Sequence, residues 1–218
     1  NMEKTYKILI AKDYIRGLLT EGLWCTDHSD ATTTLLFDGN TFEWSESICA
    51  SADIPMEKLP DIKPSLEIAG HVNKKASEDI GLPEGVPVLY GASDCSVETL
   101  AANTTRPGEC FVKLATSGVI SMTTEKPTPD PGGRTVTYCL PTADKPELWL
   151  TKSGTASCAS TLRWFRDTFC AEEVRQAEGT EKSPYELIDR MAEKVSPGSE
   201  GLIFHPYLMG ELSPYFDP

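Results

Sequence analysis

The residue that most suggests chemistry is Asp94, a lone carboxylate where an apolar run, predicted to be a buried strand, gives way to a helical pattern. The stretch 86–103 reads "VPVLYGASDCSVETLAAN", with three small residues, 91–93, directly before Asp94. Ligand sites in α/β proteins gather at the carboxyl ends of strands, so Asp94 is a candidate general base whose small neighbours admit a substrate. The alternative is a helix N-cap before a helix at 97–102, worth ~1 kcal/mol to stability. The two roles are compatible.

A second candidate is the segment 113–121, "KLATSGVIS", where one strand ends and the next begins. Thr116, Ser117 and Gly118 form a turn whose hydroxyls and backbone N–H groups can wrap a phosphate. An ordinary turn between two strands also favours these residue types. Taken alone, the segment fits the ordinary turn better.

A third segment, 153–167, reads "SGTASCASTLRWFRD". Small residues at the start of a helix allow a phosphate or a flat ligand to approach the backbone. Trp164 and Phe165 are expected in the core, and Arg166 with Asp167 on a solvated face. Locally, this segment says little about function.

The carboxylate-rich segment 26–30 suggests a metal site through Asp27, His28 and Asp30. Their spacing is not that of a metal cage, so a hydrogen-bonded loop is the preferred interpretation. No metal ligand is predicted.

Composition narrows the classes of protein. The chain has 20 Lys and Arg against 33 Asp and Glu, a formal charge of −13, which disfavours binding to nucleic acid because phosphate contacts need clustered cations. No apolar run reaches the ~18 residues of a membrane span, and the N-terminus does not resemble a signal peptide. The seven cysteines lack CxxC spacing and there are three His, so reduced thiols in the cytoplasm are expected rather than a zinc site or a disulfide framework.

Helices and strands must position these groups. Helical spacing and capping residues predict helices at 11–20, after Ser45, at 97–102, at 155–169 and, with Ser183 as N-cap, at 184–195. Alternating or apolar runs predict strands at 34–37, 86–90, 110–114, 119–122, 135–140, 148–151 and at the start of the segment from residue 201. The segment 26–33 is expected as a loop, and 54–70, with three prolines, as an extended surface connection. The mixture indicates an α/β or α+β architecture.

Five stretches, taken in order, are similar to motifs of one protein family. They are "AKDYIRGLLTEGLWCTDHSDATTTLLFD", "GLPEGVPVLYGASD", "RPGECFVKLATSGV", "LRWFRD" and "GLIFHPYLMGELSP". They resemble the Lys-Asp-Tyr segment, the Gly-x-x-Asp strand end, the Thr-Ser-Gly turn, the later helix and the Pro-Tyr-Leu-x-Gly-Glu segment of the FGGY carbohydrate kinases, especially the xylulokinase branch. The resemblance covers nearly all 218 residues.

The resemblance implies an α/β, actin-like ATPase (ribonuclease H-like) fold, with parts of two domains flanking a cleft. It also implies phosphorylation of a sugar hydroxyl by ATP with Mg²⁺, and Asp94 matches the base that takes the hydroxyl proton. The positions that match contacts to the nucleotide are Thr116, Ser117, Gly118, Ala159 and Arg163. The implied partners are therefore ATP and a small-molecule sugar.

Departures from the family pattern concern the sugar more than the phosphate. Cys95 stands where xylulokinases often have an Asn that holds the sugar, and Ala115 replaces the Gly before Thr-Ser-Gly. The substrate thus stays open between D-xylulose or a related ketose and gluconate, glycerol, ribulose or a signalling ketose. A non-catalytic sugar- or nucleotide-binding relative is the alternative from another class, and the retention of Asp94 with the Thr-Ser-Gly turn argues against it.

Family members also begin with a Gly-x-Asp-x-Gly-Thr hairpin and end with a glycine-rich adenine-binding segment, and neither occurs in this sequence. The chain thus resembles the middle of a longer kinase. Residues 1–104 would be the C-terminal part of the sugar-binding N-terminal domain, and 105–218 the N-terminal part of the nucleotide-binding C-terminal domain. We expect the isolated chain to have little or no activity, and exposed apolar surface to favour self-association, for example as a homodimer.

Overall fold

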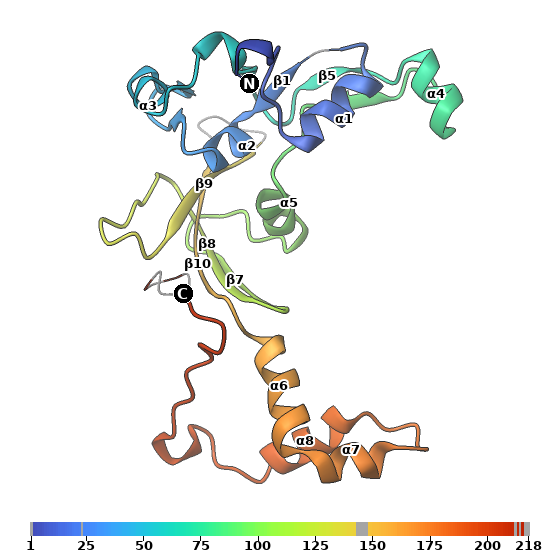
Figure 1. Cartoon of the computed structure of the whole chain (residues 1–218), viewed down its shortest axis with the longest axis vertical. Coiled ribbons are helices and arrows are strands. Elements are labelled where there is room, and N and C mark those ends of the chain that lie inside the picture. Colours follow the sequence, from blue (N-terminus) through green and yellow to red (C-terminus); the bar gives the residue numbers. More distant parts are fainter. Residues whose placement is uncertain (1, 23, 143–147, 212, 214, 216–218) are drawn as a thin grey trace. The chain divides into compact units, whose positions relative to one another are not determined.

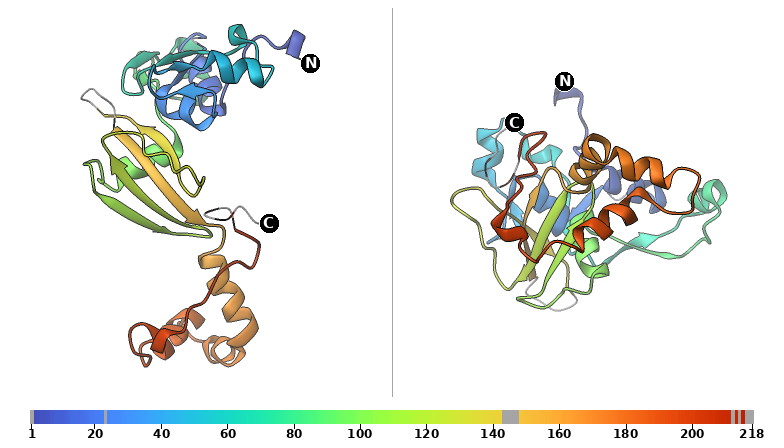
Figure 2. Two further views of the ribbon diagram at one scale, coloured as in Figure 1. Left: turned by 90° about the vertical axis from the view of Figure 1, so that its left-hand side faces the viewer. Right: turned by 90° about the horizontal axis from the view of Figure 1, so that it is seen from below.

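The computed structural model describes residues 2–22, 24–142, 148–211, 213 and 215. The chain divides into two compact units, and both contain helices and strands (Figures 1 and 2). Unit 1 comprises Asn1–Phe111, Ser121–Pro129 and Val136–Thr151, and unit 2 comprises Val112–Ile120, Asp130–Thr135 and Lys152–Pro218. The predicted domain boundary between residues 104 and 105 stays a prediction.

In the first part of unit 1, short strands and helices alternate along the chain (Figure 1). The helices are α1 (Ala11–Leu19), α2 (His28–Thr33), α3 (Glu46–Ser51), α4 (Lys74–Ile80) and α5 (Asp94–Ala101), with 3₁₀ turns η1 (Met2–Lys4) and η2 (Met56–Lys58). The strands pair two by two: β1 (Cys25–Asp27) is parallel to β4 (Asp61–Lys63), β2 (Phe37–Asp38) is antiparallel to β3 (Glu43–Trp44), and β5 (Ile68–His71) is antiparallel to β6 (Pro87–Leu89).

A four-stranded sheet has the order β7–β8–β10–β9 (Figure 1). Its strands are β7 (Cys110–Leu114), β8 (Gly118–Thr124), β9 (Val136–Leu140) and β10 (Leu148–Thr155). Within unit 1, α2 packs on β9, and the Thr32 hydroxyl accepts a hydrogen bond of 3.2 Å from the backbone N–H of Cys139. Cys139 and Leu140 are fully buried there, so this contact forms part of the core of unit 1.

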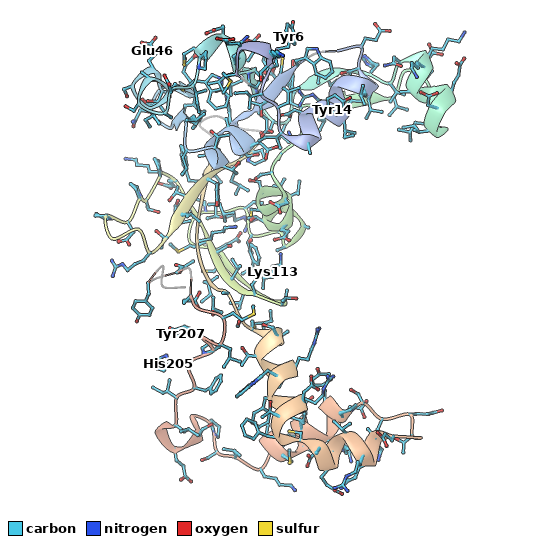
Figure 3. The ribbon with its side chains drawn as sticks, viewed as in Figure 1. Tyr6, Tyr14, Glu46, Lys113, His205 and Tyr207 are labelled. Carbon is cyan, nitrogen blue, oxygen red and sulfur yellow. The ribbon has the colours of Figure 1, made fainter. Side chains whose placement is uncertain are left out.

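The helices of unit 2 are α6 (Ala159–Phe169), α7 (Ala171–Ala177) and α8 (Pro184–Ala192), followed by the 3₁₀ turn η3 (Ser199–Gly201). The three α-helices pack against one another (Figure 1). Aromatic side chains of α6 also meet the segment after η3, since the Trp164 ring stacks on Phe204 at 6.3 Å between centroids. In the same segment, the rings of His205 and Tyr207 lie 5.3 Å apart (Figure 3).

Two helices, α3 and α8, are capped by serine side chains at the positions predicted from the sequence. Ser45 accepts from the backbone N–H of Ile48 and starts α3, and Ser183 accepts from that of Tyr185 and starts α8. Each cap satisfies a backbone N–H that the first helical turn leaves without a partner. These two predictions from the sequence are confirmed.

Other predictions were wrong. Residues 28–33 are a helix rather than a loop, and the proline-bearing stretch 54–70 contains β4 and most of β5. The described residues 202–207 form no strand, although their apolar character predicted one. Thr155 ends β10 instead of starting α6. Among the described residues, none of the helices has the length and apolar character that crossing a bilayer requires.

Two expectations about burial were also wrong. Trp164 and Phe165 are each 38% exposed rather than in the core of unit 2. The strand at 86–90 is not buried either, because Val86 and Leu89 are more than 40% exposed. A two-stranded ribbon such as β5–β6 leaves much of its surface to solvent.

Asn73 links two helices of unit 1 and provides a test of the fold. Its Oδ1 caps α4 by accepting from the Ala76 N–H at 2.8 Å, and its Nδ2 donates to the carbonyls of Leu18 and Leu19, both at 2.9 Å. We expect Asn73→Ala to lower the free energy of unfolding by ~1–2 kcal/mol, because it removes both a cap and the link to the end of α1. Urea unfolding measures this, with Ser45→Ala as the matched loss of a cap alone. A smaller loss for Asn73→Ala than for Ser45→Ala would contradict the linking role.

Candidate active site

Asp94 lies at the first residue of α5, with an exposed side chain. The N-cap is the preceding residue, Ser93, whose backbone is extended and whose side chain makes no capping bond. The carboxylate of Asp94 accepts from the backbone N–H of Cys95 at 2.7 Å. The cap interpretation was therefore wrong by one residue, and Asp94 presents a carboxylate at the positive end of a helix, where negative charge is stabilised.

The loop directly before Asp94 is held at three points by main-chain hydrogen bonds. The Tyr90 carbonyl accepts from both Lys12 Nζ and Arg16, each at 3.0 Å. The N–H of Gly91 donates to the Ser65 carbonyl at 3.0 Å, and that of Ser93 donates to the Ser29 hydroxyl at 2.8 Å.

Gly91 adopts a backbone conformation in this loop that favours glycine. Its φ is +85°, a conformation that side chains disfavour. An added Cβ would also lie 3.4 Å from Lys12 Cδ. The small residues before Asp94 thus serve the backbone and its packing on Lys12.

All three anchors of the loop lead to one buried carboxylate, Asp27, at the end of β1. Its Oδ1 accepts from the hydroxyls of Ser29 and Ser65 at 2.6 and 2.8 Å, and from the Ser29 N–H at 2.9 Å. Its Oδ2 lies 2.5 Å from Lys12 Nζ. The side chain is fully buried and caps α2, so one carboxylate orders β1, α2, Lys12 and Ser65 together.

The residues of the suspected metal segment divide in the structure. Asp27 and Asp30 come together with Asp13, a residue that the sequence did not single out, and their carboxylate oxygens lie within 4.8 Å of one another. His28 instead lies against the Phe37 and Phe42 rings. The Lys12 ammonium lies 3.2, 2.5 and 3.0 Å from the carboxylates of Asp13, Asp27 and Asp30, in the place that a cation would take. The cluster is thus a set of ion pairs.

Burial and neighbouring charges shift the pKa values of Asp27 and Asp30 in opposite directions. Burial opposes the charge of Asp27, but the ion pair with Lys12 and the hydroxyls of Ser29 and Ser65 outweigh it and lower the pKa of Asp27. Burial and the negative charge of Asp27 raise the pKa of Asp30 to about 6. Burial disfavours the Lys12 ammonium, yet the three carboxylates raise its pKa above the ordinary value.

The second group of predicted residues lies in unit 2, on the turn between β7 and β8. Within the part of the chain that the structure describes, the backbone N–H groups of Thr116 and Ser117 donate no hydrogen bond, and Thr116 is exposed. Gly118 is buried where an added Cβ would lie 3.0 Å from Thr155 Cγ2 and 3.3 Å from Cys158 Cβ. The turn can therefore offer N–H and hydroxyl donors to an anion while Gly118 allows it to sit close to the end of β10.

The turn is fixed by the start of α6. The N–H of Cys158 donates to the Thr116 carbonyl and that of Ala159 to the Ala115 carbonyl, both at 2.8 Å. Arg163, one helical turn after Ala159, is exposed. The structure thus brings Ala159 against the Thr-Ser-Gly turn, with Arg163 on the same helix. Asp94 and Cys95 belong to unit 1.

Sequence reasoning missed three side chains that position these elements: Lys12, Arg16 and Glu211. Glu211 is 4% exposed and accepts from the Thr155 hydroxyl at 2.5 Å and from the Ala156 N–H at 2.9 Å. It thereby fixes the connection between β10 and α6. A Glu within "GELSP" and a Lys within "AKDY" carry no local signal for such roles, because their partners lie 15 to 78 positions away.

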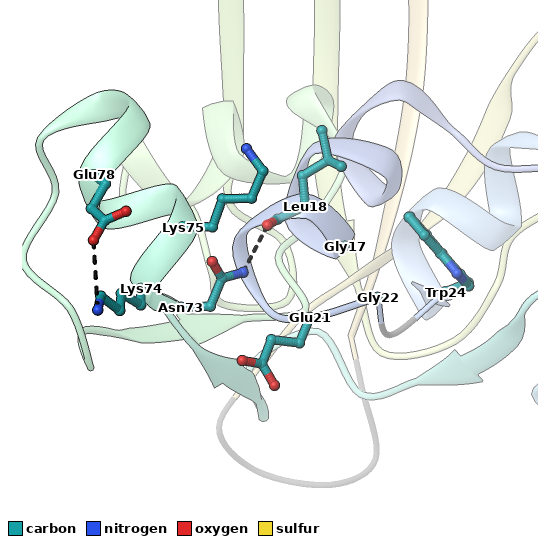
Figure 4. A pocket seen from close by; sticks show the side chains of 9 residues that line it. All are labelled: Gly17, Leu18, Glu21, Gly22, Trp24, Asn73, Lys74, Lys75 and Glu78. Atoms are coloured by element: carbon teal, nitrogen blue, oxygen red, sulfur yellow. Dashed lines mark hydrogen bonds and ion pairs between the residues drawn. The ribbon is translucent and has the colours of Figure 1, made fainter.

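Cavities open on the described residues of both units. One, of about 570 Å³, lies in unit 1 between the ends of α1 and α4, and none of the predicted site residues lines it (Figure 4). Another, of about 310 Å³, lies in unit 2 and is lined by Gly118, Thr155 and Cys158, among others. It therefore adjoins the Thr-Ser-Gly turn.

Two family models match the chain. The N-terminal domain of the FGGY family of carbohydrate kinases matches residues 1–101, and the C-terminal domain of the same family matches residues 110–218. The Gluconokinase of Bacillus subtilis is 33% identical over 99% of this chain and 41% of its own length, and the Xylulose kinase of Lactococcus lactis is 31% identical over 97% and 39%.

Solved structures agree with these matches. The ligand-bound xylulose kinase from Lactobacillus acidophilus has a TM-score of 0.82 and 26% identity, covering 97% of this chain and 40% of that one. The gluconate kinase from the same species has a TM-score of 0.78 and 27% identity, covering 94% and 39%. The chain spans about 40% of the length of the curated relatives it matches.

The carboxyl group of Asp30 provides a test of the buried cluster. Its pKa is raised from 3.8 to about 6, so the folded state holds the proton more tightly than the unfolded chain. Its contribution to stability is therefore present below pH 4 and is lost as the pH rises to about 6. We expect the stability of the wild type relative to Asp30→Asn to fall across this window, as measured by urea unfolding at several pH values. A difference that stays constant from pH 4 to 6 would contradict the charge crowding described here.

Proposed function

Because the chain belongs to the FGGY family of carbohydrate kinases, we propose that it supplies part of the active site of a kinase that phosphorylates a hydroxyl group of a sugar or sugar acid with ATP. The fold class expected from the sequence, an actin-like α/β ATPase, is confirmed by the structural matches. The observation that carries the proposal is the exposed Asp94 carboxylate, held at the start of α5 by a buried ionic network.

In this proposal Asp94 is the general base. Its carboxylate takes the proton of the acceptor hydroxyl as that oxygen bonds to the γ-phosphorus of ATP, and the bond from the γ-phosphorus to the bridging oxygen breaks to release ADP. Phosphoryl transfer depends on alignment and on neutralised charge more than on covalent help from the protein. A base with a fixed backbone meets the first of these needs.

The Thr-Ser-Gly turn is proposed to hold the phosphates of the nucleotide. Its hydroxyls and N–H groups are donors, and donors are what phosphate oxygens require. Ala159 is proposed to line the same contact through its backbone, and Arg163 to add positive charge. Mg²⁺ enters with ATP as part of the substrate and neutralises phosphate charge; no metal ligand of this chain is proposed.

The acceptor is proposed to be a linear polyol with a carbonyl or carboxylate group. D-xylulose or a related ketose and gluconate both fit this class, and the relatives that match include enzymes named for each. Cys95 follows the proposed base and is proposed to contact the acceptor, so its side chain helps to choose between them. Assays of the full-length kinase with both compounds decide the substrate.

Other features of the proposal concern the setting of the kinase. Cys25, Cys49 and Cys170 are buried free thiols, and the proposed location is the reducing cytoplasm. ATP and the sugar are the proposed partners, and a homodimer stays a prediction.

Removal of the proposed base is the first test. We expect Asp94→Asn in the full-length kinase to lower kcat by ~10²–10⁴-fold, because an amide cannot accept the proton in the transition state. Coupled measurement of ADP release reports kcat, and ATP binding should be retained. Glu98→Gln, a carboxylate-to-amide change one turn further along α5, is the matched control. Undiminished ADP release by Asp94→Asn would show that Asp94 is not the base.

Removal of the turn hydroxyls is the second test. We expect the double variant Thr116→Ala/Ser117→Ala to raise KM for ATP by ~10²-fold or more with a small effect on KM for the sugar, because each lost hydrogen bond to a charged group costs about 1.5–3 kcal/mol. Steady-state kinetics with each substrate varied in turn measures the two constants. Thr124→Ala, at the other end of β8, serves as the control. A rise confined to KM for the sugar would assign the turn to the acceptor instead.

A further inference from the structure

Lys12 contacts both the loop before Asp94 and the buried carboxylate of Asp27. Its ammonium lies 2.5 Å from Asp27 Oδ2 and donates to the Tyr90 carbonyl at 3.0 Å. Tyr90 stands four residues before Asp94, and the chain between them turns at Gly91 with a φ of +85°. The position of Tyr90 therefore sets where the turn, and the start of α5 behind it, can lie.

The same cluster holds the other end of this loop. The Ser29 hydroxyl donates to Asp27 Oδ1 at 2.6 Å and accepts from the N–H of Ser93 at 2.8 Å. Ser93 is the residue directly before Asp94 and the N-cap of α5. Two paths thus run from Asp27 to the backbone on either side of the turn, one through Lys12 and one through Ser29.

Arg16 supports Tyr90 independently of Lys12. Its guanidinium donates to the Tyr90 carbonyl at 3.0 Å and lies over the Tyr90 ring, 5.2 Å from the centroid. It is itself paired with Asp13 at 2.8 Å. Loss of Lys12 therefore leaves the loop attached, but without its direct tie to Asp27.

We propose that Lys12 is a positioning residue for phosphoryl transfer: by bridging Asp27 and the Tyr90 carbonyl, it fixes the placement of the Asp94 carboxylate. This inference rests on the proposed function, in which Asp94 is the base. Lys12 acts through the backbone of the loop and touches no reacting group. A structural ion pair alone would not need the contact with Tyr90.

The test is Lys12→Met in the full-length kinase. We expect kcat to fall by ~30–100-fold with KM for ATP within twofold of the wild type, because a displacement of about 1 Å at a reacting group can cost a factor of ~10². Lys75→Met is the matched control, since Lys75 lies exposed on α4 and pairs with Asp79 at 2.5 Å. We expect that control to keep the wild-type kcat.

A double variant separates positioning from general damage. If Lys12 acts through Asp94, Lys12→Met has little further effect on kcat in the Asp94→Asn background, because the group that it positions no longer acts as a base. Transfer from γ-labelled ATP is sensitive enough to measure the residual rate. An equal loss from Lys12→Met in both backgrounds would overturn the positioning role, as would an unchanged kcat in the single variant.

A milder variant keeps the proposal testable if Lys12→Met fails to fold. Ser29→Ala removes the hydroxyl that accepts from the Ser93 N–H, and should lower kcat by ~10-fold with the same loss of effect in the Asp94→Asn background. An unchanged kcat in Ser29→Ala would then overturn the inference. Undiminished kcat in Asp94→Asn alone would instead overturn the proposed function, so the two failures are distinguishable.

Discussion

The carboxylate of Asp27 is the group on which the order of unit 1 depends. It is fully buried, and a buried charge is strongly destabilising unless it is paired and hydrogen-bonded. Lys12 supplies the pair, and the hydroxyls of Ser29 and Ser65 supply hydrogen bonds. Because these partners come from α1, from α2 and from the chain between β4 and β5, meeting the needs of one charge fixes three parts of the fold at once.

In unit 2 the groups that need hydrogen-bond partners belong to the backbone. The first N–H groups of α6 have no partner within their own helix, and they donate to the carbonyls of Ala115 and Thr116 in the β7–β8 turn. The buried carboxylate of Glu211 then satisfies the Thr155 hydroxyl and the Ala156 N–H just before the helix. The same contacts that complete the helix therefore hold the proposed phosphate turn in place. In both units, groups that must be satisfied for stability also position groups proposed for chemistry.

The sequence predicted the features that depend on neighbouring residues. Ser45 and Ser183 were recognisable as caps because the bond that each makes spans two or three residues, and β7 because its run is apolar and bounded by turn residues. β4 and β5 were missed because their pairing partners, β1 and β6, are distant and the prolines nearby suggested a loop. The sequence predicts a loop at 28–33 because its threonines disfavour a helix locally. The helix forms nonetheless, because its N-cap, Asp27, is held by an ion pair with Lys12, which lies in another helix.

The residues of the candidate site also divide into those that local sequence reveals and those that depend on distant partners. Asp94 and the Thr-Ser-Gly turn could be named from local sequence and resemblance, whereas Lys12, Arg16 and Glu211 act on residues far away in the chain. The most direct test of the account is amide hydrogen exchange at Gly91 and Ser93, whose N–H groups donate to Ser65 and Ser29. Slow exchange in the wild type that becomes much faster in Asp27→Asn is the predicted result. Exchange at the rate of an unprotected loop in the wild type would contradict the claim that the buried Asp27 network fixes the segment that carries Asp94.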